Sequence, residues 1–86
     1  MTTAKIDPQL KQAMQAQPDA EFLLLLRVDQ IDASCEQALA ARGVSIRRSL
    51  TLVPTFAVTC TGSVGLSLLD LPWIHRVEED RPVYVL

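Results

Sequence analysis

The sequence predicts an α+β protein in which a small antiparallel sheet carries helices on one face. Two stretches, Glu21–Asp29 and Phe56–Cys60, place apolar side chains at every second residue, which is the period of a strand. A third stretch, Ile31–Arg42, carries apolar residues at the spacing of one helix face. The chain has 86 residues, of which 49% are hydrophobic, so we expect one small domain with an aliphatic core.

A short helix is predicted first, over Pro8–Gln17. Asp7 is a suitable N-cap, and the proline that follows it suits the first helical position. The apolar stripe of this helix is thin, so we expect the helix to be held only loosely. The chain is thus divided into an N-terminal extension at residues 1–20, a domain at residues 21–80 and an extended tail at residues 81–86.

The clearest strand is Glu21–Asp29. One face of it is continuously apolar and must belong to the core, with Phe22, Leu24, Leu26 and Val28. The opposite face carries Leu23 and Leu25 among polar residues, which is unusual for a face in contact with water. These two leucines need a cover, and the sequence leaves open whether the N-terminal helix or a partner protein supplies it.

The helix over Ile31–Arg42 has defined ends. Asp29 and Asp32 are both candidates for capping its first turn, because aspartate side chains accept hydrogen bonds from exposed N–H groups there. Gly43 fits the position just after the last turn, where the backbone often becomes left-handed.

A hairpin is predicted next. Val44–Val53 alternates as a strand, but Arg48 breaks the alternation, so we expect a β-bulge or an exposed strand end near it. Pro54–Thr55 forms the turn, and Phe56–Cys60 returns as the paired strand.

The last third of the chain predicts a second short helix and a final strand. Ser63 is the expected N-cap of a helix over Val64–Leu71, which the next residue, a proline, ends. The final strand begins at Ile74 and is expected to stop near Asp80, because Pro82 cannot donate to a sheet ladder.

The resulting order, β–α–β–β–α–β after an extra N-terminal helix, is that of a ferredoxin-like sandwich. This fold has four antiparallel strands and two helices on one face of the sheet. The helix-free face would carry an aliphatic centre with Leu23 and Leu25, and an acidic edge with Glu78 and Asp80.

Composition and spacing argue against several classes of protein. The net charge of −2 and the scattered basic residues argue against nucleic-acid binding. No stretch approaches the roughly 18 apolar residues that span a bilayer. The N-terminal stretch lacks the apolar segment of a secretory signal, so we expect a cytoplasmic protein.

The chain also carries little that resembles catalytic machinery. Cys35 and Cys60 match no metal or redox spacing, and we expect both to be reduced core thiols. His75 is the single histidine, and a surface position explains it better than catalysis does. With no glycine-rich phosphate loop and no metal-ligand cluster, we expect neither a cofactor nor an enzyme.

Glu78 and Asp80 form the one suggestive pair. Two carboxylates at i and i+2 project from one strand face about 7 Å apart. They could accept hydrogen bonds from two exposed helix N-termini of a partner, where unpaired N–H groups and the helix dipole favour anions. The alternative is a solvated acidic edge that prevents aggregation.

The run LLDLPWIHRVEED at residues 68–80 resembles the closing motif of subtilisin propeptides and of related propeptide-like serine protease inhibitors. That motif has a short helix with leucines, a proline or small residue, an apolar strand and then Val-Glu-x-Asp. The apolar strand Phe22–Val28, the helix ending at Gly43 and the strand Phe56–Thr59 agree with the same pattern. The resemblance covers residues 21–86.

This resemblance implies an inhibitor, and a folding template, of a subtilisin-like serine protease. The open sheet face would lie against two parallel helices of the enzyme, and Glu78 and Asp80 would cap those helices. The tail would lie in the substrate cleft as an added strand. Leu86 would then fill the primary specificity pocket and Val83 the fourth subsite, with Tyr84 and Val85 between them.

A different class of function remains open at this point. A ferredoxin-like module can also use its open face for protein interaction or self-association without any protease partner. In that case Leu23 and Leu25 would be buried in a homodimer.

Overall fold

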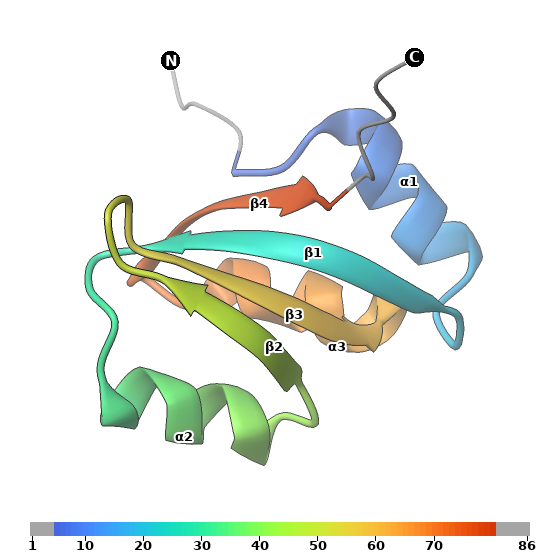
Figure 1. The fold of residues 1–86 in the computed structure, drawn as a ribbon. Coiled ribbons are helices and arrows are strands. Elements are labelled where there is room, and N and C mark those ends of the chain that lie inside the picture. The colour runs from blue at the N-terminus through green and yellow to red at the C-terminus, as the bar shows by residue number, and fades with distance from the viewer. Residues whose placement is uncertain (1–4, 81–86) are drawn as a thin grey trace, which may run out of the picture.

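The computed structural model describes residues 5–80 and is built around β1 (Glu21–Val28), the strand that joins the two halves of the sheet. β1 pairs antiparallel with β3 (Thr55–Thr61) on one side and with β4 (Ile74–Glu79) on the other. β2 (Ser45–Leu50) pairs with β3, so the order of the sheet is β2-β3-β1-β4 (Figure 1). The predicted α+β class and the four-stranded antiparallel sheet are confirmed.

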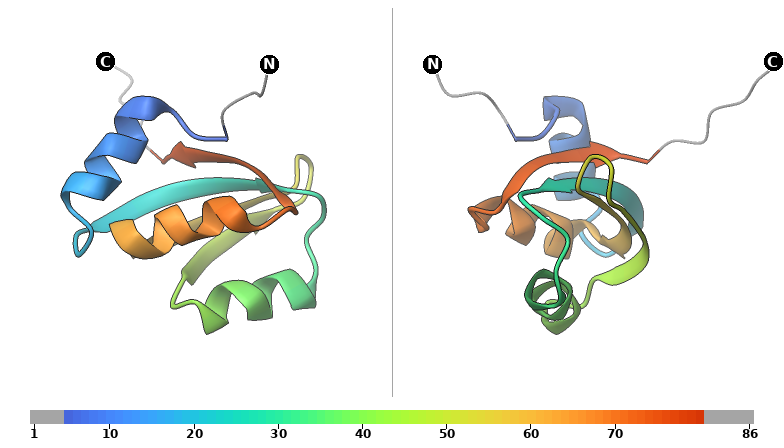
Figure 2. Two further views of the ribbon diagram at one scale, coloured as in Figure 1. Left: turned by 180° about the vertical axis from the view of Figure 1, so that it is seen from behind. Right: turned by 60° about the vertical axis from the view of Figure 1, so that its left-hand side comes forward.

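The helices follow the predicted succession. They are α1 (Pro8–Ala16), α2 (Ala33–Ala41) and α3 (Gly62–Ser67), and a short 3₁₀ turn, η1 (Leu68–Asp70), extends α3. Seen from behind, α3 lies across the sheet, whereas α2 lies below it, beside β2 (Figure 2). The face behind the sheet holds the core, which includes Leu24, Leu26, Leu39, Phe56, Val58, Leu68, Ile74 and Val77.

The N-terminal helix is a full part of this core, and the expectation that it is loosely held is wrong. Met14 is completely buried, and Leu10 nearly so. The N-terminal segment is also tied to β4, because Ile6 forms a parallel bridge with Val77 and the Val77 N–H donates to the Lys5 carbonyl at 2.8 Å. A thin apolar stripe suffices here because each of its side chains is enclosed.

A β-bulge in β2 changes which side chains reach the helix-free face. The register shifts between Ile46, which lies opposite Val58, and Arg48, which lies opposite Ala57. The bulge near Arg48 is therefore confirmed. One extra residue moves every later side chain to the other face. Leu50 accordingly leaves the core side on which the alternation placed it, and it is 40% exposed.

Most predicted boundaries differ from the structure by one or a few residues, and three of the differences concern caps and the hairpin. Asp32, not Asp29, is the N-cap of α2, and its carboxylate accepts from the Cys35 N–H at 2.9 Å. Thr61 caps α3 in place of Ser63, so the helix starts at Gly62. β2 ends at Leu50 instead of continuing to residue 53. Each shift arises where two neighbouring residues are both competent caps, or where the hairpin turn takes more residues than the sequence suggests.

The expected glycine after α2 is confirmed. Gly43 follows α2 with a φ of 87°, the left-handed conformation that favours glycine at this position. No helix within residues 5–80 combines the length and the apolar content required to cross a bilayer.

Candidate functional site

The candidate site is the helix-free face of the sheet, called here the open face. The register sets its side chains in rows across the strands. In one row Leu25 lies between Ala57 on β3 and Glu78 on β4. The other outward-facing residues are Leu23, Arg27, Arg48, Leu50, Thr55, Thr59, Arg76 and Asp80. Figure 1 views this face, with α3 behind the sheet.

The two predicted contact carboxylates are both on this face, and both are held by arginines of the same chain. Glu78 lies 3.2 Å from the Arg27 guanidinium and 3.5 Å from that of Arg76. Asp80 lies 2.8 Å from Arg47, the bulge residue of β2. Ion pairs at partly exposed positions contribute little stability, about 0–1 kcal/mol each, and a carboxylate keeps free lone pairs beside one such partner.

The predicted acidic edge is therefore only part of the charge on the open face. Four guanidinium groups gather here, from Arg27, Arg47, Arg48 and Arg76, against the two carboxylates. Sequence reasoning missed this excess because the bulge, which directs Arg47 and Arg48 to this side, is not visible as a charge pattern.

An apolar depression of about 450 Å³ lies at the hairpin end of the open face. Four aliphatic side chains line it, together with Arg27, Thr55 and Glu78, and these four are Leu25, Leu50, Leu52 and Val53. Of these four aliphatic residues, the sequence pattern had assigned only Leu25 to the open face. The other three reach it because β2 changes parity at the bulge and then ends at Leu50.

Leu23 and Leu25 lie as predicted on the open face, and α1 does not cover them. Leu23 is 46% exposed, and Leu25 is half-buried. α1 packs instead on α3, on the opposite side of the sheet. Of the two covers considered, the N-terminal helix is therefore eliminated. The predicted contacts of Val83, Tyr84, Val85 and Leu86 fall outside the described residues.

The groups that could carry chemistry are dispersed. His75 pairs with Asp29 at the surface, where both side chains are more than half exposed. Cys60 faces the core, and burial raises the pKa of its thiol to about 11, while burial also raises the pKa of the Cys35 thiol. Both cysteines are free thiols. Within residues 5–80, no three side chains of metal-binding type come close enough together to hold an ion.

Comparison with protein-family models, with curated proteins and with solved structures found no match to this chain.

Proposed function

We propose that this chain is a propeptide-like inhibitor of a subtilisin-like serine protease, which it binds through the open face and residues 81–86. The observation that carries the proposal is the position of Glu78 and Asp80. Both carboxylates stand on a face without helices, at the end of β4, directly before the apolar tail of the sequence. A strand end of this kind can dock by its side chains and pass the chain into a neighbouring cleft.

The apolar surface beside these carboxylates supports the same reading. Leu23 and the depression lined by Leu25 and Leu50 offer aliphatic contact area next to the acidic groups. Stable interfaces combine an apolar centre with a polar rim, and the open face has both. A partner with two exposed helix N-termini would satisfy the carboxylate lone pairs that the arginines leave free.

The arginine contacts define what binding requires. Asp80 must either share its carboxylate between Arg47 and the partner or exchange one for the other. Its side chain is 21% exposed and that of Glu78 is 35% exposed, so both remain accessible. Because exposed ion pairs of this type are weak, the exchange costs no more than about 1 kcal/mol for each pair.

The test is inhibition of a purified subtilisin-type protease, measured with a chromogenic peptide that has an apolar residue before the scissile bond. The double variant Glu78→Gln/Asp80→Asn keeps the shape of both side chains and removes their charge. We expect it to weaken inhibition by at least about tenfold, as expected for loss of charged contacts at an interface. Truncation after Asp80 should weaken it further.

Two controls separate docking from folding. Asp70→Asn removes a carboxylate from the exposed part of η1, away from the open face, and should inhibit as the wild type does. Arg47→Ala removes the internal partner of Asp80 and should not weaken inhibition. If the double variant and the truncation both inhibit like the wild type, the proposal is wrong.

A second candidate function is self-association through the open face, without a protease. The exposure of Leu23 favours it, because no segment within residues 5–80 covers this leucine. Sedimentation equilibrium decides: an open-face homodimer should dissociate in the Leu23→Asp variant, and a wild-type chain that stays monomeric at millimolar concentration contradicts it.

A further inference from the structure

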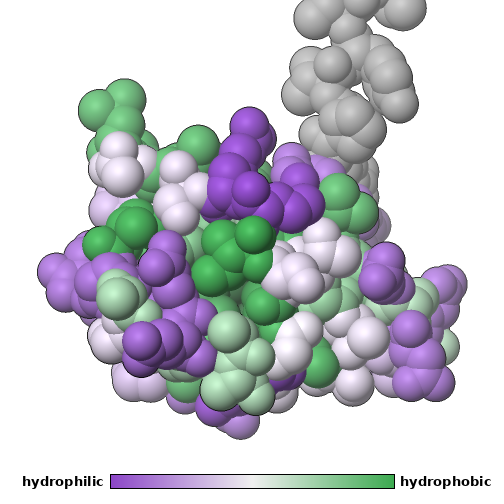
Figure 3. All heavy atoms as spheres, turned by 60° about the horizontal axis from the view of Figure 1, so that its bottom comes forward, coloured by the Kyte–Doolittle hydropathy of each residue, from purple (hydrophilic) through white to green (hydrophobic). Residues whose placement is uncertain are grey.

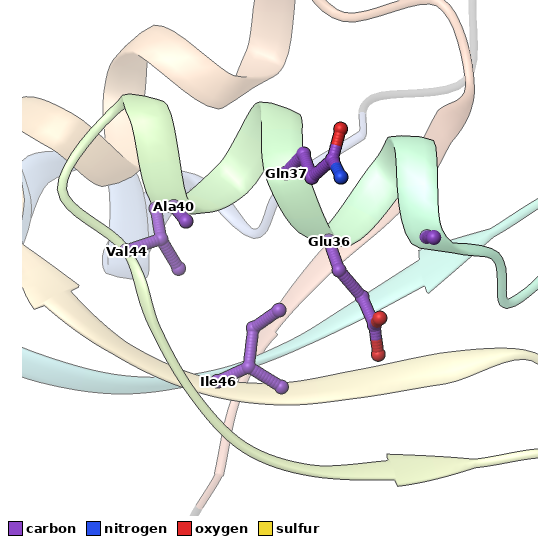
Figure 4. A pocket seen from close by; sticks show the side chains of 6 residues that line it. Glu36, Gln37, Ala40, Val44 and Ile46 are labelled. Atoms are coloured by element: carbon purple, nitrogen blue, oxygen red, sulfur yellow. The ribbon is translucent and has the colours of Figure 1, made fainter.

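An apolar crevice lies between α2 and β2, on the side of the molecule away from the open face. It has a volume of about 360 Å³ and is lined by Ala33, Glu36, Gln37, Ala40, Val44 and Ile46. Figure 4 shows Ile46 pointing from the strand towards the helix, and Glu36 reaching from the helix towards the strand. The crevice exists because α2 presents alanines here, which are too short to meet the strand.

The tip of the β2–β3 hairpin is the most exposed apolar feature among the described residues. Leu52 is 98% exposed and Val53 54% exposed. A single exposed leucine is ordinary, but these two adjoin the half-exposed Leu50 in one projecting group. The hairpin and α2 form separate projections of the molecule, so the tip does not reach the crevice of its own chain (Figures 1 and 2).

The charges around these two features are opposite. Acidic side chains stand at the start of α2, where Glu36 lines the crevice and Asp32 caps the helix. Beside the hairpin tip, Arg48 precedes it on β2. Arg27 lines the depression under the tip, but there it is paired with Glu78 at 3.2 Å. Within residues 5–80 the side chain of Arg48 has no ion-pair or hydrogen-bond partner, so its charge is available. Figure 3 shows hydrophobic side chains bordered by strongly hydrophilic ones on the side that bears α2 in Figure 1.

We propose that two copies of this chain associate by inserting the hairpin tip of one copy into the α2–β2 crevice of the other. The knob is Leu52 with Val53, and the socket is the crevice lined by Ala40 and Ile46. A second copy fits both features, because its aliphatic tip, with Arg48 beside it, meets an aliphatic socket that is bordered by Glu36. Opposite charges at the rim fix the orientation of such a contact.

This contact differs from the open-face contacts considered above in its socket, whereas its knob, Leu52 with Val53, also lines the depression of the open face. Knob and socket are different surfaces, so each copy can offer one while receiving the other. Ala40 lies outside the open face, so Ala40→Glu tests this contact without altering the surface proposed for protease binding.

The experiment is sedimentation velocity of the full chain over a micromolar to millimolar range. The wild type should show concentration-dependent association. Leu52→Asp makes the knob charged, and Ala40→Glu fills the socket with a charged side chain. Each variant should raise the dissociation constant by at least about tenfold, the loss expected when a central anchor is removed. Both positions are exposed in the single chain, so circular dichroism should show unchanged folding.

Mixing the two variants gives the sharpest test. The Leu52→Asp chain keeps an intact socket, and the Ala40→Glu chain keeps an intact knob, so an equimolar mixture should form mixed dimers that neither variant forms alone. Leu23→Asp, the same change at an exposed leucine outside knob and socket, should associate as the wild type does. A wild type that is monomeric throughout overturns the proposal, as does a mixture that stays monomeric or a dimer that only Leu23→Asp dissociates.

Discussion

The helices α3 and α2 both flank the sheet, but they cover it in different ways. α3 begins with Gly62 and contains Gly65, and both glycines are buried. α3 packs between the sheet and α1, whose Met14 is completely buried against it. Within Ala33–Ala41, by contrast, Leu39 is the one fully buried residue, and a crevice remains between the helix and β2. One side of the core is therefore closed and the other is partly open.

The difference follows from where small residues are placed. Glycines in α3 allow a second helix to approach it, because a Cβ at Gly62 would lie 2.7 Å from the carbonyl oxygens of Met14 and Gln17. Alanines in α2 face a strand instead, and no third element among residues 5–80 fills the space that they leave. Small residues thus give close packing only where another helix or strand packs against them. Where none does, they leave a crevice on the surface.

The largest effect should come from shortening one buried side chain on each side of the core, Met14 of α1 beside α3 and Leu39 of α2. We expect Met14→Ala to destabilise the protein by about 4 kcal/mol, because its site is enclosed by α3 and β1 and cannot collapse. Leu39→Ala should cost about 2 kcal/mol, since α2 is free to settle into the space. Urea unfolding measures both. Equal losses for the two variants would contradict the contrast between the closed and the open side.

A second effect concerns the glycines of α3. Gly62→Ala should cost about 3 kcal/mol, because its new methyl group meets backbone oxygens that cannot turn away. Gly65→Ala is the matched control. Its methyl group would meet the Met14 Sδ at 3.1 Å and the Leu24 Cδ1 at 3.2 Å, and both atoms belong to side chains and not to the backbone. The gain in helix propensity, about 1 kcal/mol, offsets much of that crowding. A Gly65→Ala protein as unstable as Gly62→Ala would show that α1 and α3 pack differently.

The smallest effect should be seen at the start of α2, where stability depends on pH. The Cys35 backbone N–H, with the side chains of Ser34 and Gln30, holds the pKa of Asp32 well below its ordinary value. A lowered pKa in the folded state means that the ionised cap stabilises fully above the ordinary aspartate pKa of about 3.9, and that this contribution is lost as the pH falls below it.

Asp32→Asn isolates this charge, because asparagine also caps helices. The difference in unfolding free energy between wild type and variant should be constant above about pH 5 and should shrink towards about pH 2. Urea unfolding at several pH values measures it. Parallel curves for the two proteins down to about pH 2 would show that Asp32 titrates normally.

The candidate site was only partly predictable. Strand parity placed Leu23, Leu25, Glu78 and Asp80 on one face, because side-chain direction alternates strictly along β1 and β4. The position of the bulge was also readable, since Arg48 interrupts an apolar alternation. The effect of the bulge on which side chains reach the open face could not be predicted, because it depends on how the partner strand pairs on either side of the bulge. Leu50 and the arginine excess on the open face therefore came only from the structure.

The sequence alone determined the class of the fold, the succession of its elements and which strand faces are apolar. These are properties of local periodicity, caps and turn residues, and each is encoded within a few neighbouring positions. Only the tertiary structure decided that α1 completes the core, that Arg47 spans the open face to Asp80, and that α2 leaves a crevice. Those features depend on distances between segments far apart in the chain, where a single methyl group or a single extra residue changes which side chains meet.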